Sequence, residues 1–164
     1  NEVYLYDVAA GREPAVLRGH SAPATAAAYR PDGGQLATAG NDQTIRLWDP
    51  ATGQQTAVLR PEVTPPKPDR LLAVAYNADG TRLASFATVA DGAGTSRLWD
   101  ATTGRELAAL ADWQEQSRPV AFSPDGKRVA ASSAEFVHLY ENNTELTRAM
   151  EEYENLGAFL EHVS

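Results

Sequence analysis

The hydrophobic positions of this chain fall into short runs that recur around a common turn. The turn reads Pro31-Asp32-Gly33 and Pro124-Asp125-Gly126, with the variant Ala78-Asp79-Gly80 between them. An apolar run precedes each turn, and another follows it. These runs have the length of strands, alternate in part and are bounded by turn residues, which favours strands over helices. The Asp-Gly pair supplies the residue of positive φ that a tight hairpin needs, so the pattern predicts repeated antiparallel hairpins.

The hairpins belong to a longer repeat, because the turn residues Asp32, Asp79 and Asp125 lie 47 and 46 residues apart. A third apolar run ends each unit, and a fourth copy of that run opens the chain; the four copies are Val3–Asp7, Ile45–Asp49, Ser96–Asp100 and Val137–Glu141. Four antiparallel strands in a unit of this length are typical of a β-propeller blade. We therefore expect a partial blade at 1–18 and units at about 19–60, 61–111 and 112–141, which together make a repeat region at 1–141.

One unit resembles a known family. Residues 19–49 read GHSAPATAAAYRPDGGQLATAGNDQTIRLWD and are similar to a WD40 repeat, with GH at the start, PDG in the middle and DQTIRLWD at the end. The resemblance covers about residues 2–141, although the later units lack the GH and the third ends in Tyr140-Glu141. It implies an all-β fold of WD40 propeller blades and a non-catalytic scaffold that binds other proteins.

The resemblance also implies a structural tetrad within the first unit. The residues at the tetrad positions are His20, Thr38, Asp42 and Trp48. A closed hydrogen-bond network of this kind satisfies buried polar groups and fixes how the strands meet. In the second unit Ser85 and Trp99 remain without the histidine.

The number of units predicts an open arc of about three blades, because a closed propeller has roughly 4–8 blades. An arc exposes apolar sheet faces, so we expect a protein partner, a homo-oligomer or poor solubility.

The last segment, 142–164, departs from the repeat. Leu146, Ala149, Met150 and Tyr153 follow helical spacing, which predicts an amphipathic helical tail that packs on the arc or docks a partner. The tail also resembles a short segment of UvrD/PcrA-type DNA helicases. The chain holds no Walker A motif, so the resemblance implies no helicase activity.

Composition excludes several classes of function. The net charge of −8 gives no basic footprint for nucleic acid, and no apolar run reaches the roughly 18 residues that a membrane helix needs. Cysteine is absent, which excludes disulfides and thiolate metal sites. The chain begins with Asn1, without a basic region or a long apolar run. We expect a cytoplasmic chain without a signal peptide, cut from a longer protein.

Candidate chemistry is sparse. The histidines His20, His138 and His162 have no spacing typical of metal ligands, and no nucleophile motif is present, so we expect no catalytic, metal or cofactor site. The candidate protein-binding residues are Asn41, Arg70 and Trp113, in loops that the resemblance places on one face. Two expected loops of the second unit, 61–70 and 88–95, are unusually long. The alternative is that these loops are tolerated insertions and that Trp113 fills a gap between blades.

Protein–protein scaffolding is the predicted function. The Ala-rich sequence and the WDxxTG turns at 48–53 and 99–104 resemble bacterial WD40 arrays attached to signalling ATPases or kinases. One alternative is a structural fragment that self-assembles into a closed oligomer, and another is a chimeric or artificial chain. An enzyme with an active site in a central channel is opposed by Ala24, Leu71 and Arg118 at the expected starts of the first strands.

Overall fold

The computed structural model describes residues 1–7, 13–61, 70–88, 94–113, 118–132 and 137–141. For residues 72, 110–113, 118–119, 131–132 and 137–141 it describes the backbone alone. Within these ranges the chain is all-β, with thirteen strands in four antiparallel sheets and no helix. The predicted helical tail at 142–164 lies outside the described residues.

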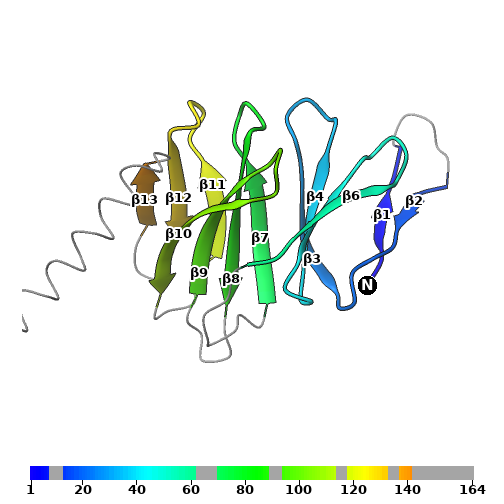
Figure 1. Cartoon of the computed structure of the whole chain (residues 1–164), viewed down its shortest axis with the longest axis horizontal. Coiled ribbons are helices and arrows are strands. Elements are labelled where there is room, and N and C mark those ends of the chain that lie inside the picture. Colours follow the sequence, from blue (N-terminus) through cyan, green and yellow to red (C-terminus); the bar gives the residue numbers. More distant parts are fainter. Residues whose placement is uncertain (8–12, 62–69, 89–93, 114–117, 133–136, 142–164) are drawn as a thin grey trace, which may run out of the picture.

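Each sheet is built from strands that follow one another in the sequence. The first sheet holds β1 (Val3–Leu5) and β2 (Ala15–Leu17), and the second holds β3 (Ala24–Tyr29), β4 (Leu36–Gly40), β5 (Ile45–Trp48) and β6 (Gln55–Leu59). The third holds β7 (Arg70–Tyr76), β8 (Arg82–Thr88), β9 (Gly94–Asp100) and β10 (Glu106–Trp113), and the last holds β11 (Arg118–Phe122), β12 (Arg128–Ser132) and β13 (Val137–Glu141). Figure 1 shows these sheets side by side, in chain order, from β1 and β2 to β13.

The Asp-Gly turns form the hairpins that the sequence predicts between the first two strands of each unit. Gly33, Gly80 and Gly126 all have positive φ, at 73°, 72° and 69°. The preceding aspartate caps each turn: for example, the Asp32 carboxylate accepts a hydrogen bond from the Gly34 amide over 2.9 Å. The same cap recurs at Asp79 and Asp125. Glycine is the residue that adopts this backbone conformation without strain.

Apolar side chains fill the spaces between neighbouring sheets. The core between the β3–β6 and β7–β10 sheets contains Ala37, Ala39, Ile45, Leu47, Leu59, Leu71, Val74, Leu83, Ala87, Trp99 and Ala101. A second core joins the β7–β10 and β11–β13 sheets through Ala84, Phe86, Leu98, Val120 and Val129. A third core joins the β1–β2 sheet to the β3–β6 sheet through Val3, Leu5, Leu17, Leu36 and Trp48. The sheets therefore pack face to face, as propeller blades do.

Three predictions of loop residues were wrong, because the residues lie in strands: Arg70, predicted at the end of a loop, is the first residue of β7. Thr88, Gly94 and Thr95 were predicted within a loop, but they pair in the ladder between β8 and β9. Trp113 was predicted in a loop between units, but it is the last residue of β10 and pairs with Gly94. The β7–β10 sheet is therefore longer than the repeat pattern predicts, because its two central strands continue pairing past the position where the first unit turns.

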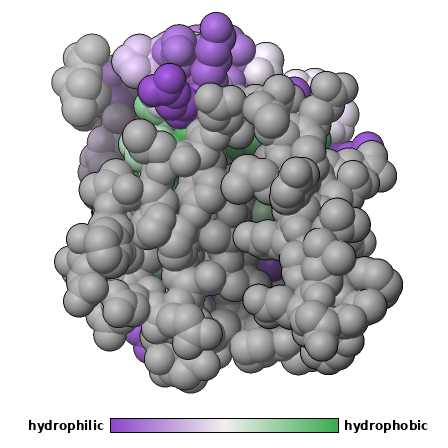
Figure 2. Space-filling model, turned by 90° about the vertical axis from the view of Figure 1, so that its left-hand side faces the viewer, coloured by the Kyte–Doolittle hydropathy of each residue, from purple (hydrophilic) through white to green (hydrophobic). Residues whose placement is uncertain are grey.

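The end of the molecule that carries β11–β13 faces the viewer in Figure 2. The described residues along the upper edge of this end are mostly hydrophilic, and apolar atoms are visible beneath them. Among the described residues, no helix has the length and apolar character required to span a membrane.

Candidate functional site

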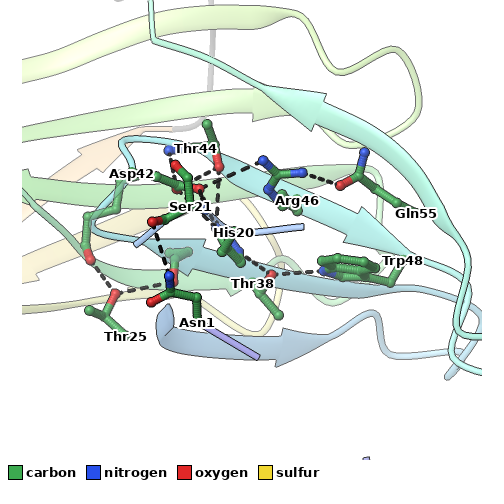
Figure 3. A network of polar contacts seen from close by, with 12 residues as sticks. Asn1, His20, Ser21, Thr25, Thr38, Asp42, Thr44, Arg46, Trp48 and Gln55 are labelled. Atoms are coloured by element: carbon green, nitrogen blue, oxygen red, sulfur yellow. Dashed lines mark hydrogen bonds and ion pairs between the residues drawn. The ribbon is translucent and has the colours of Figure 1, made fainter. Parts of the chain in front are cut away.

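A buried polar network lies within the β3–β6 sheet and contains all four residues of the predicted tetrad (Figure 3). Trp48 lies on β5, and its indole Nε1–H donates a hydrogen bond to Thr38 Oγ1 on β4 over 2.8 Å. His20 precedes β3, and its Nε2 lies 2.8 Å from the same hydroxyl oxygen. The Nδ1 of His20 lies 3.0 Å from each carboxylate oxygen of Asp42, in the turn between β4 and β5. The structure thus brings the four side chains together in one chain of hydrogen bonds.

The network fixes the proton positions on His20. Since the Asp42 carboxylate only accepts hydrogen bonds, the His20 Nδ1 must donate to it. In the neutral imidazole, Nε2 then accepts, and the Thr38 hydroxyl donates to Nε2 while accepting from Trp48. Every polar group in this chain is satisfied in that arrangement, so the network supports the structure and leaves no donor free for a substrate.

Asp42 is the most highly connected residue of the network. Besides His20, its carboxylate accepts hydrogen bonds from the Ser21 amide over 2.9 Å and from the Thr44 hydroxyl over 2.7 Å. Arg46 Nη2 lies 3.7 Å from the carboxylate. Burial of the Asp42 carboxyl raises its pKa, but the hydrogen bonds from Thr44, His20 and Ser21 outweigh burial and lower the pKa to about 2. Asp42 is therefore ionised across the physiological range.

Ser21, Thr44 and Arg46 were not predicted as partners of Asp42. The sequence did contain a signal for Thr44, because an aspartate side chain often accepts hydrogen bonds from the residue two positions further on. The turn also holds Gln43 at a φ of 64°, the one non-glycine residue of positive φ in the described part. Such a conformation is uncommon outside glycine, and here the turn is held by the bonds between Asp42 and Thr44.

In the described residues of the β7–β10 sheet, the indole–hydroxyl bond of this arrangement recurs. The Trp99 indole donates to Ser85 Oγ over 2.9 Å, as Trp48 does to Thr38. By the repeat spacing, the positions of His20 and Asp42 fall on residues outside the described part. Among the described side chains of this sheet, Arg82 Nη1 lies 3.1 Å from the Asp100 carboxylate, and Arg97 pairs with Glu106.

The three candidate binding residues lie at one end of their sheets. Arg70 begins β7 and pairs across the sheet with Thr88, which pairs with Gly94, which pairs with Trp113, so Arg70 and Trp113 end opposite edge strands of the same sheet. Asn41 follows β4, and its amide donates to the Pro23 carbonyl just before β3. The Thr25 hydroxyl on β3 donates to the Leu71 carbonyl, which joins the start of β3 to the start of β7.

The three residues differ in accessibility. The Arg70 side chain is exposed and Asn41 is half-buried. The side-chain carbonyl oxygen of Asn41 is buried and has no hydrogen-bond partner among the described residues. The Trp113 side chain lies outside the part of the structure that is described. Arg70 is thus the candidate that is both exposed and fixed on a strand.

Acidic residues elsewhere cap turns. Asp49 accepts a hydrogen bond from the Ala51 amide over 2.8 Å, and Asp100 accepts from the Thr102 and Thr103 amides over 3.0 and 2.9 Å. These bonds lower the pKa of both carboxyls. Across the described ranges, no group of three or more histidine and acidic side chains is arranged to hold a metal ion.

The chain is similar in sequence to a known repeat family and to several proteins that contain such repeats. The family model described as "WD domain, G-beta repeat" matches residues 11–49. Autophagy-related protein 16 of Arabidopsis thaliana is 30% identical over 139 residues, which cover 84% of this chain and 25% of that protein. The guanine nucleotide-binding protein subunit beta of Zea mays is 29% identical over 120 residues, which cover 72% of this chain and 31% of that protein. Coronin-7 of Mus musculus is 34% identical over 101 residues, covering 58% of this chain and 10% of that protein.

The chain therefore spans at most about a third of the length of these relatives. All three relatives are eukaryotic, and the bacterial context stays a prediction. The matched segment contains His20, Thr38, Asp42 and Trp48, the residues that form the buried network. The matched family model, the relatives and the repeated four-stranded sheets show that the chain belongs to the WD40-repeat family.

Proposed function

We propose that the chain is a non-catalytic scaffold that binds protein partners through the end of its sheets that carries Arg70 and Asn41. Membership of the WD40-repeat family supports a role in protein interaction. One relative is, by its name, a subunit of a larger assembly. The observation that carries the proposal is that Arg70 is exposed at the first position of a strand whose next residue is fully buried. Such a residue presents a hot-spot side chain from a rigid backbone.

Packing explains why this end is rigid. Leu71 follows Arg70 directly and lies in the core between the β3–β6 and β7–β10 sheets. Its carbonyl oxygen accepts the Thr25 hydroxyl from the neighbouring sheet. Arg70 therefore loses little backbone freedom when a partner binds, which lowers the entropic cost of association. The guanidinium group favours an acidic or carbonyl-rich partner surface.

The wider organisation is part of the proposal. Sheets of two, four, four and three strands support a partial blade at 1–18 and units at about 19–60, 61–111 and 112–141, arranged as an open arc. We place this arc in the cytoplasm, within a longer protein of the same repeat type. The segment 142–164 is proposed as a separate tail.

A charge-reversal pair tests the binding surface. The tagged chain and its variants Arg70→Glu and Arg105→Glu are used to recover partners from extract of the source cells, with cross-linking and mass spectrometry. Arg105 is also exposed, but it follows the turn after β9, away from Arg70. We expect Arg70→Glu to lose at least one protein that both the unchanged chain and Arg105→Glu retain. Equal recovery by all three chains contradicts the proposed surface.

A second candidate function is self-assembly of two arcs into a larger ring. The observation that favours it is that, in the described residues, both terminal sheets have fewer strands than the two central sheets. Light scattering behind a sizing column distinguishes the two functions, since a discrete dimer at micromolar concentration supports assembly and a monomer excludes it.

A further inference from the structure

The Asp-Gly turns carry a backbone bond that is prone to spontaneous rearrangement. In an Asp-Gly pair the glycine amide nitrogen can attack the aspartate carboxyl, because glycine has no side chain to hinder the approach. Three pairs lie in the described turns after β3, β7 and β11: Asp32-Gly33, Asp79-Gly80 and Asp125-Gly126. Figure 1 shows these turns at the same edge of the molecule. A fourth pair, Asp91-Gly92, lies outside the described residues.

The rearrangement needs water and no other reactant. The glycine nitrogen forms a bond to the aspartate Cγ, the amide proton and the carboxyl hydroxyl leave together as water, and a five-membered succinimide ring results. Water then opens the ring at one of its two carbonyl carbons. Opening at Cγ restores aspartate, whereas opening at the former main-chain carbonyl gives isoaspartate, in which the chain runs through the side-chain carbon. The product has one more backbone atom in the turn.

The fold ties up the attacking nitrogen in the same way in the second and third units. The Gly80 amide donates a hydrogen bond to the Asn77 carbonyl over 3.0 Å, and the Gly126 amide donates to the Ser123 carbonyl over 2.8 Å. The nitrogen cannot reach the carboxyl while this bond is intact. Rearrangement therefore requires local opening of the turn.

The fold also keeps the two carboxyls in a poorly reactive form. Asp79 accepts hydrogen bonds from the Thr81 hydroxyl and amide, and Asp125 accepts from the Ser123 hydroxyl and the Lys127 amide. These bonds lower the pKa of both carboxyls. An ionised carboxyl loses oxygen less readily than a protonated one. In these local bonds the two turns are closely matched.

The two turns differ in what covers the glycine. Gly80 is buried, and a Cβ atom built on it would lie 2.6 Å from Arg30 Cγ and 2.9 Å from Arg30 Cδ. Arg30 follows β3 in the neighbouring sheet, and its Nε is held 2.8 Å from the Asp32 carboxylate. Gly126 is half-buried, and its nearest neighbour, Asn77 Nδ2, would lie at 3.5 Å, an ordinary contact distance.

The Arg30 contact opposes the motion that the reaction needs. Ring closure requires rotation about the Asp79 Cα–C bond, which displaces the Gly80 α-carbon. The methylene groups of Arg30 lie against that carbon, so the rotation becomes possible only after Arg30 moves away. Because Arg30 and Gly80 belong to different sheets, this means that the β3–β6 and β7–β10 sheets must separate at this edge.

We propose that Asp79-Gly80 is a modification site at which isoaspartate forms only when these two sheets separate, and that the Arg30 side chain is its cover. The product is an isoaspartyl carboxylate, a substrate for enzymes that methylate this group. The longer backbone of the modified turn no longer matches the bond from Gly80 to Asn77, so the modification records the separation and hinders its reversal. The site lies at the opposite end of β7 from Arg70, so it is distinct from the proposed binding surface.

The test compares the two turns within one molecule. The unchanged chain and its Arg30→Ala and Arg30→Met variants are aged near neutral pH and digested. Isoaspartate at each turn is then quantified by chromatography and electron-transfer fragmentation. Peptides 74–85 and 120–131 give the rate of each turn without a fold. Arg30→Met is the matched variant, because it keeps an unbranched side chain over Gly80 without the charge, and circular dichroism checks that each chain is folded.

Relative to its own peptide, Asp79 of the unchanged chain should rearrange at least about threefold more slowly than Asp125, because its turn opens less often. Arg30→Ala should raise the rate at Asp79 by at least about fivefold and change the rate at Asp125 by less than about twofold. Arg30→Met should keep Asp79 protected.

Three results would overturn the proposal. The first is an unchanged Asp79 rate in folded Arg30→Ala, and the second is an equal rise at both turns, which indicates general loosening. The third is loss of protection in Arg30→Met, which would assign the effect to the charge of Arg30 and not to its cover. If Arg30→Ala does not fold, the unchanged chain still decides, since a relative rate at Asp79 equal to or above that at Asp125 contradicts the cover.

Discussion

The described residues of the β3–β6 and β7–β10 sheets share one polar contact, and a longer network is seen around it in the β3–β6 sheet. In both, a tryptophan that is 1% exposed donates to a hydroxyl on the neighbouring strand. Only in the β3–β6 sheet does the structure show the hydroxyl linked further to His20 and Asp42. The β7–β10 sheet nevertheless pairs over four strands of greater length. In the β3–β6 sheet, the indole–hydroxyl bond joins β5 to β4, and the His–Asp half ties the segment before β3 to the β4–β5 turn.

The largest expected effect is the loss of either tryptophan. Trp48→Ala and Trp99→Ala should each lower the free energy of unfolding by about 3–5 kcal/mol, because each removes a fully buried aromatic side chain. Urea denaturation followed by circular dichroism measures both. A much smaller loss of unfolding free energy for Trp99→Ala would show that the two tryptophans do not contribute equally to the stability of their sheets. Tyr4→Ala, at an exposed position, should change the value by less than about 0.5 kcal/mol.

Removal of the hydroxyl that accepts the indole bond should lower the free energy of unfolding by different amounts in the two sheets. Thr38→Val leaves both the Trp48 indole and the His20 ring without a partner, so we expect a loss of about 2–5 kcal/mol. Ser85→Ala leaves the Trp99 indole alone unpaired among the groups described, so the expected loss is about 1–3 kcal/mol. The same denaturation experiment compares them, and Thr38→Ser should recover most of the loss because it keeps the oxygen. Equal losses for Thr38→Val and Ser85→Ala would mean that the histidine bond adds no stability.

The carboxylate of Asp42 should give the β3–β6 sheet a sensitivity to acid. Folding lowers the pKa of Asp42 from 3.8 to about 2. A carboxyl whose pKa is lower in the folded state stabilises the fold above the unfolded pKa, and that stability is lost as the pH falls towards the folded pKa. This lowering of the pKa corresponds to about 2 kcal/mol of unfolding free energy.

The measurement is the unfolding free energy of the unchanged chain and of Asp42→Asn between pH 6 and pH 2. We expect Asp42→Asn to be less stable at pH 6, with the difference narrowing between about pH 4 and pH 2. Parallel curves for the two chains would show that Asp42 is not the group responsible.

The smallest expected effect is an increase in the free energy of unfolding. Ser96 on β9 is fully buried, and its hydroxyl has no hydrogen-bond partner among the described residues. Its equivalent in the β3–β6 sheet is Ile45, a core residue. Ser96→Ala removes an unpaired polar group and should raise the free energy of unfolding by up to about 1 kcal/mol. Ser85→Ala is the matched control, since the same substitution at a bonded serine should destabilise; a loss at both sites contradicts the assignment of Ser96.

Much of the fold could be predicted from the sequence because it is set locally. The Asp-Gly turns, the third strand of each unit and the partial sheet at the N-terminus all have short-range signals. The tetrad positions followed from resemblance, and the structure brings His20, Thr38, Asp42 and Trp48 within hydrogen-bond distance. The partners Ser21 and Arg46 carried no signal of their own, because their role depends on where Asp42 lies in the folded turn.

Strand ends were harder to predict, because a glycine can either lie in a loop or lie in a strand where a neighbouring side chain comes close to the backbone. Gly94 was read as loop punctuation, yet it lies in β9, where a Cβ atom would come within 2.5 Å of the Phe86 ring. This glycine permits a close approach of strand and side chain. The distinction depends on a neighbour on β8 and is therefore a tertiary effect that periodicity does not report. Trp113 was misplaced for the same reason, since its strand depends on pairing with Gly94.

The order of strands has a consequence for how quickly the chain acquires its structure. Every ladder among the described strands joins strands that are consecutive in the sequence. Pairing between consecutive strands closes short loops, which lowers the entropic cost of forming each sheet. Each sheet can form as soon as its own residues leave the ribosome, and the next sheet then adds to an existing surface. A chain built in this way can gain or lose whole units by duplication or deletion without a new pairing scheme.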